Sequence, residues 1–137
     1  MSKNSGLPKR YEQDGYYILV VDVEKNRLTQ IASGQWKDPV DLPNYNIDTK
    51  NAVSQLKKGY TALIILKETK PPAFKMTSYV RENQQIMMDA GLRKSAVVFN
   101  EKSKMFQKFV MNVVGKLSKV PFKAFDTLEE AEAFLKE

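Results

Sequence analysis

The chain has 137 residues, of which 42% are hydrophobic and 28% charged, with a formal net charge of +6, as expected for one soluble globular domain. It has no cysteine and no histidine, which excludes disulfides and Cys-ligated zinc and removes the commonest general base and the usual catalytic triads. We therefore expect no metal, no cofactor and no catalytic residues, and a binding role in place of turnover.

The N-terminal residues are polar, without the apolar segment of a signal peptide. No apolar stretch approaches the roughly 20 residues that a membrane span requires. We expect a cytoplasmic protein of bacterial type, with association at the membrane periphery left open. Residues 1–14 are expected to form a disordered tail, and residues 15–137 a single domain.

The first half of the chain predicts a hairpin, a helix and a buried strand. The β-branched and aromatic run over residues 15–23 predicts a strand, and residues 27–36 return as its hairpin partner. Asp48 is expected to cap a helix over residues 49–58. The uninterrupted apolar run over residues 60–66 indicates a strand that is buried on both faces, as parallel strands usually are.

The second half alternates helices and strands after a break at Pro71 and Pro72. The expected elements are a helix over residues 73–90, a strand over 95–99, a helix over 102–118, a short strand over 122–125, and a helix over 128–136 capped by Thr127 or Asp126. This order, ββαβαβαβα, predicts an α/β fold in which a β-hairpin opens a mixed sheet of four to five strands, with helices packed on the sheet.

Four strings carry a resemblance to a known family: "RLTQIASGQWKD", "KKGYTALII", "MMDAGLRKSAVV" and "FDTLEEAEAFLKE". Their order along residues 16–136 resembles the SpoIIAA-like branch of the STAS superfamily. The resemblance implies a four- or five-stranded sheet and a binding or regulatory role. This branch is also similar to the lipid-carrier fold of phosphatidylinositol-transfer proteins, which implies apolar ligands and mobile helices.

Anti-sigma-factor antagonists of the superfamily carry a phosphorylated Ser, directly after an Asp, at the start of the helix that follows the third strand. This chain has "KETKPPAFKMTS" there, without an Asp-Ser pair, and its nearest hydroxyls are those of Thr69, Thr77 and Ser78. The phosphorylation switch is therefore not expected. A regulatory protein-protein interaction without that Ser, in a homodimer or with another partner, remains the alternative function.

Methionines cluster in the helices expected over residues 73–90 and 102–118, which hold five of the six. Asn83 interrupts the apolar stripe of the first helix. Methionine suits adaptable binding surfaces, so the leading hypothesis is a site for an apolar or lipid-like ligand or a membrane surface, while an ordinary core face is the alternative. The candidate residues are Phe74, Met76, Met87, Met88, Met105, Phe106, Phe109 and Val110. Trp36 and Tyr45 could line the mouth of such a pocket or simply pack over the hairpin.

Basic residues cluster between Gly91 and Lys123, a segment with eight basic residues and one acidic residue. The predicted basic surface, which would attract an anionic membrane or an acidic partner, consists of Arg93, Lys94, Lys102, Lys104 and Lys108. For residues 91–94 a helix end followed by solvated charges is the alternative. Nucleic acid is not an expected partner, because the segment does not interleave exposed aromatic residues with its charges.

Overall fold

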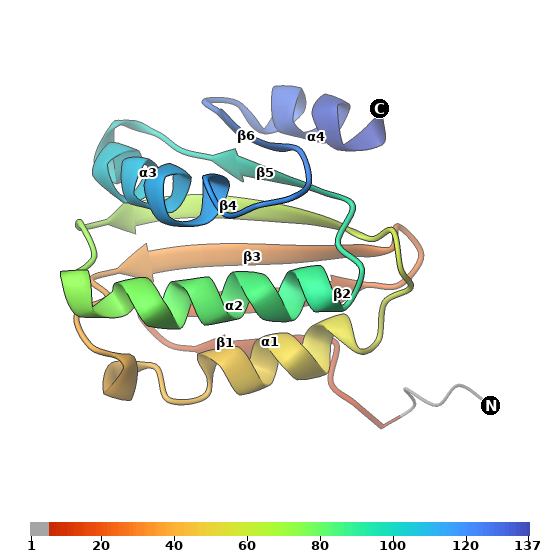
Figure 1. Cartoon of the computed structure of the whole chain (residues 1–137), viewed down its shortest axis with the longest axis horizontal. Helices are drawn as coiled ribbons and strands as arrows, with labels where there is room; N and C mark the ends of the chain where they lie inside the picture. The colour runs from red at the N-terminus through yellow and green to blue at the C-terminus, as the bar shows by residue number, and fades with distance from the viewer. Residues whose placement is uncertain (1–5) are drawn as a thin grey trace.

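A computed structural model describes residues 6–137, which form one six-stranded sheet covered by helices (Figure 1). The strands lie in the sheet in their order along the chain. They are β1 (Arg10–Gln13), β2 (Tyr17–Asp22), β3 (Arg27–Gly34), β4 (Thr61–Thr69), β5 (Lys94–Val98) and β6 (Phe122–Phe125). The first three are antiparallel neighbours, and β3 to β6 run parallel. The predicted mixed α/β architecture is confirmed, with one strand more than the four to five expected.

The extra strand is β1, which lies within the expected tail. Residues 10–13 pair with β2, and Tyr11 packs its half-buried ring against the core. The prediction of disorder was wrong for these residues. The string "RYEQ" has no apolar run that would indicate a strand, and its strand is held by the hydrogen-bonded ladder with β2. The first five residues of the expected tail lie outside the described part of the chain.

Helices α1 (Tyr45–Val53), α2 (Thr77–Asp89) and α3 (Lys104–Val110) cover one face of the sheet, and α4 (Leu128–Lys136) packs on the other face over β4 to β6. Ala62, Ile64 and Leu66 of β4 belong to the large core under the first three helices, whereas Leu63 belongs to the small core under α4. The expected burial of this strand on both faces is confirmed.

The helix boundaries differ locally from the sequence pattern. Helix α1 begins at Tyr45, so Asp48 is not its cap but lies in its first turn, where its carboxylate accepts a hydrogen bond of 2.7 Å from the Tyr17 hydroxyl. A 3₁₀ turn, Phe74–Met76, precedes α2, and a π-helical turn, Met111–Gly115, continues α3. The Thr127 hydroxyl accepts from the Glu130 N–H and caps α4, as one of the two expected alternatives.

Candidate functional site

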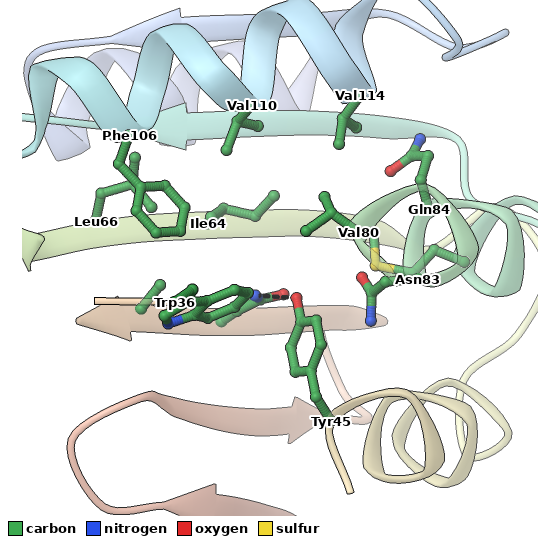
Figure 2. A pocket seen from close by; sticks show the side chains of 13 residues that line it. Trp36, Tyr45, Ile64, Leu66, Val80, Asn83, Gln84, Phe106, Val110 and Val114 are labelled. Carbon is green, nitrogen blue, oxygen red and sulfur yellow. Dashed lines mark hydrogen bonds between the residues drawn. The ribbon is translucent and has the colours of Figure 1, made fainter. Parts of the chain in front are cut away.

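A small cavity lies in the core between the sheet, α2 and α3 with its π-helical extension (Figure 2). Its volume is about 30 Å³. The lining side chains are those of Gln30, Ala32, Trp36, Tyr45, Ile64, Leu66, Val80, Asn83, Gln84, Met87, Phe106, Val110 and Val114. One water needs about 10–15 Å³ of cavity volume measured in this way, so the cavity has room for one or two waters and not for an acyl chain.

Polar side chains enter this apolar cavity from α1, α2 and β3. The Gln30 amide donates to the Tyr45 hydroxyl, and the Asn83 amide donates to the Thr49 hydroxyl at 2.8 Å. Gln84 is 3% exposed, and its Nε2 has no hydrogen-bond partner among residues 6–137. A buried amide donor without a partner destabilises a fold, so a water in this cavity would recover part of that cost.

The structure divides the predicted ligand-binding residues into separate groups. Met87, Phe106 and Val110 line the cavity, and Met76 is fully buried in the same core. The half-buried residues Met88 and Phe109 lie outside the cavity, and Phe74 and Met105 are exposed on the surface.

Sequence reasoning missed Gln30 and Gln84 as lining residues. Trp36 and Tyr45 do line the cavity, but as buried core residues and not at an open mouth. Asn83, the polar break in an apolar stripe, was the available signal. A helical wheel shows such a break without showing what faces it.

The predicted basic surface is also divided. Lys94 is 9% exposed, and its Nζ donates to the Phe134 carbonyl oxygen at 2.9 Å and lies 4.5 Å from the centre of the Phe134 ring. Arg93 donates to the carbonyl oxygens of Leu135 and Glu137. These two side chains bind the last carbonyls of α4, which attract cations; Lys94 is buried there, whereas Arg93 is exposed. Lys102, Lys104 and Lys108 are exposed, as expected.

Apolar side chains are exposed at the carboxyl end of the parallel strands, at the left of Figure 1, where the connections into η1 (Pro39–Asp41), η2 (Phe74–Met76) and α3 lie. Phe74 is 89% exposed, Val40 75% and Met105 55%. We call this end of the molecule the carboxyl-end surface; it comprises residues 35–41, 67–76 and 100–108. Sequence reasoning missed Val40, because a single valine between two prolines has no periodic context.

Hydrogen bonds and ion pairs hold these connections side by side. The Ala73 N–H donates to the Trp36 carbonyl oxygen at 2.9 Å, and the Lys75 Nζ lies 2.8 Å from the Asp38 carboxylate. The hydrogen bond from Lys75 holds the pKa of Asp38 below its usual range. The pair is therefore intact at neutral pH and is lost in acid as the pH falls through that lowered value.

The carboxyl-end surface carries seven lysines against four carboxylates. Two of those carboxylates face lysines, Asp38 beside Lys75 and Glu68 at 4.0 Å from Lys102. A hollow of about 500 Å³ opens between the ends of β3 and β4 and the start of α3. Its lining residues are Gly34, Gln35, Glu68, Thr69, Lys70 and Lys102. Exposed apolar side chains, free ammonium groups and a hollow thus occur on one end of the protein.

The tyrosines of the core should titrate abnormally. Burial raises the pKa of Tyr45, Tyr60 and Tyr17 above the usual value of 10.0. Because unfolded tyrosines ionise near pH 10, the stability that these residues contribute is complete below that pH and declines as the pH rises above it. We expect an alkaline titration, followed by tyrosinate absorbance, to show fewer than the six tyrosines ionising while circular dichroism reports a folded chain. Ionisation of all six near pH 10 in the folded protein would contradict this burial.

The architecture, two antiparallel strands leading into a parallel αβ sheet, is a SpoIIAA-like fold. The structure is similar to that of an uncharacterised protein of the DUF3478 family with a SpoIIAA-like fold, from Shewanella loihica PV-4. The TM-score is 0.60, with 12% sequence identity, over 91% of this chain and 98% of that one. At this identity the likeness shows the fold alone, and it confirms the SpoIIAA-like architecture expected from the sequence. No protein-family model and no curated protein matches the chain.

Two further observations concern the described residues, 6–137. None of their helices combines the length and the apolar character needed to cross a bilayer. They also contain no group of three or more acidic, His or Cys side chains placed to hold a metal ion.

Proposed function

We propose that this chain is a non-enzymatic binding module that attaches to the surface of anionic membranes through its carboxyl-end surface. The observation that carries the proposal is the exposure of Phe74, Val40 and Met105 on three neighbouring connections, among lysines. Large apolar side chains that project from a surface rimmed by cations match the chemistry of the bilayer interface, which offers acyl chains beneath anionic headgroups.

The energies of the two contributions are comparable. Insertion of one Phe side chain contributes about 1.5–3 kcal/mol, and each lysine near an anionic surface about 1 kcal/mol. Five lysines of this surface have no ion-pair partner within residues 6–137, namely Lys37, Lys67, Lys70, Lys104 and Lys108. Stable attachment needs several of these contributions together, so removing either the apolar or the basic side chains should weaken binding to the membrane.

The membrane surface is favoured over an internal lipid site. A cavity of about 30 Å³ would have to grow many-fold to hold an acyl chain, which requires α2 and α3 to separate and break the contact of Phe106 with Trp36. Phe74 and Met105, by contrast, are already in water and can enter a membrane without any rearrangement of the core.

The proposal is tested by co-sedimentation with vesicles of phosphatidylcholine alone and with added phosphatidylglycerol. We expect binding only to the anionic vesicles, weakened by salt, and about tenfold weaker for Phe74→Ser, since losing 1.4 kcal/mol lowers affinity tenfold. Val23→Ser is the matched control, because Val23 is 49% exposed but lies at the opposite end of the sheet. Equal binding by Phe74→Ser and Val23→Ser, or no binding to either vesicle, would refute the proposal; the second result would favour the regulatory protein interaction.

A further inference from the structure

The hollow between the ends of β3 and β4 has the features of an anion site. The ladder between these two strands shifts register between Ala32 and Gly34, and Gly34 then pairs with Thr69 at the strand ends. The Lys70 N–H donates to the Gly34 carbonyl oxygen at 3.0 Å and holds the two strand ends together beside the hollow. The crevice outside the carboxyl ends of parallel strands is a common position for ligands in α/β proteins.

Thr69 supplies the first of these features. The residue is 8% exposed, and its hydroxyl is buried without a hydrogen-bond partner among the described residues. Leaving a buried hydroxyl unpaired costs about 1–3 kcal/mol. Thr69 lines the hollow, so a strong acceptor bound there would recover this cost once the side chain turns its hydroxyl toward it.

Lysines supply the second feature. Lys70 is exposed, and the side chain of Lys102 is 70% exposed. The nearest carboxylate to the Lys102 Nζ is that of Glu68 at 4.0 Å, the outer limit of an ion pair, and the Glu68 side chain is 80% exposed. Both ammonium groups are therefore available to a ligand, and Glu68 is the one lining residue that opposes an anion.

We infer that this hollow binds a phosphomonoester, with the ammonium groups of Lys70 and Lys102 and the hydroxyl of Thr69 as its ligands. A phosphomonoester carries a charge of about −1.5 to −2 at neutral pH and has three acceptor oxygens, which suits two cations and one hydroxyl better than a singly charged diester does. The inference rests on the proposed function for the source of the phosphate, which is the headgroup of a lipid such as phosphatidic acid. A soluble phosphomonoester shares the same chemistry.

The soluble arm of the test titrates the full chain with glycerol 3-phosphate while amide chemical shifts are recorded. We expect shifts at Gly34, Thr69 and Lys70, and about tenfold weaker binding for Lys70→Gln combined with Lys102→Gln. Glu68→Gln should strengthen binding, because it removes the one opposing charge. Lys25→Gln replaces an exposed lysine in the turn between β2 and β3, at the opposite end of the sheet, and should leave the affinity unchanged. Thr69→Val should weaken binding without loss of stability, since the hydroxyl has no partner to lose.

The vesicle arm compares phosphatidic acid with phosphatidylglycerol at matched surface charge. Stronger binding to phosphatidic acid, abolished by the double lysine variant but not by Lys25→Gln, supports a lipid source. Vesicle binding without amide shifts at the hollow overturns the inference and leaves the proposed function standing. Amide shifts that depend on Lys70 and Lys102 without any vesicle binding support the phosphate site with a soluble source and refute the proposed function.

Discussion

Replacing Trp36 by alanine is expected to lower the free energy of unfolding by about 3–5 kcal/mol, the range for removing a large buried aromatic side chain. Trp36 is 2% exposed and packs edge-on against Tyr45 and Phe106, with ring centres 5.0 and 5.3 Å away (Figure 2). Its indole N–H donates to the Ser33 carbonyl oxygen at 3.1 Å. The substitution removes both aromatic contacts and adds the volume of the indole to the existing cavity, which Trp36 lines. Tyr45 and Phe106 then lose a packing partner.

Urea unfolding followed by far-ultraviolet circular dichroism measures this loss, because Trp36 is the single tryptophan and its fluorescence disappears with it. Phe74→Ala is the control, since Phe74 is 89% exposed and its truncation should change the stability by no more than about 0.5 kcal/mol. Similar losses for the two variants would contradict the packing of Trp36 between α1, α3 and the sheet.

Gly34→Ala should destabilise the protein by roughly 3 kcal/mol or more, because two penalties coincide. Gly34 has φ +75°, where a side chain costs about 1–2 kcal/mol. In addition, a Cβ at this position would lie 2.2 Å from the Gly15 carbonyl oxygen, a backbone atom that cannot move aside alone. The turn between β1 and β2 is fixed there by the Ser33 N–H, which donates to the Tyr16 carbonyl oxygen at 3.0 Å.

Gly59→Ala separates the two penalties. Gly59 has φ +90° with open space around the added Cβ, so this variant should lose only the conformational term of about 1–2 kcal/mol. The two variants are compared by urea unfolding. A loss for Gly34→Ala no greater than that for Gly59→Ala would contradict the close approach of the β1–β2 turn to the end of β3.

Much of the fold follows from local pattern. The short, unbroken apolar run over residues 60–66 is rich in β-branched residues and indicates a strand covered on both faces. Thr127 ahead of "LEEAEAFLK" marks the start of α4. Strand β1 could not be found in this way, since an edge strand of mostly polar residues is defined by its partner. The start of α1 was misplaced because Asp48, a favourable cap by type, instead bonds to Tyr17 of a distant strand.

The candidate site was predictable as a list of apolar residues but not as a surface. Helical periodicity shows that Met76, Met105 and Phe106 are apolar positions on helices; it does not show which of them another layer covers. Residues two positions apart in a helical turn lie on nearly opposite sides, so Phe74 faces solvent while Met76 is fully buried.

The sequence by itself determined the chemistry available to this protein and the alternation that makes an α/β sheet. Without cysteine or histidine, the titratable and nucleophilic side chains left to it are carboxylates, lysines, tyrosines, serines and threonines. Only the tertiary structure decided where these residues act. Lys94 and Lys102 have the same side chain, yet the register of β5 points the first at the final carbonyls of α4, while the second lies in water beside Thr69. The charge follows from the residue type, but the interactions that a charged side chain makes depend on which groups the fold brings within a few ångströms of it.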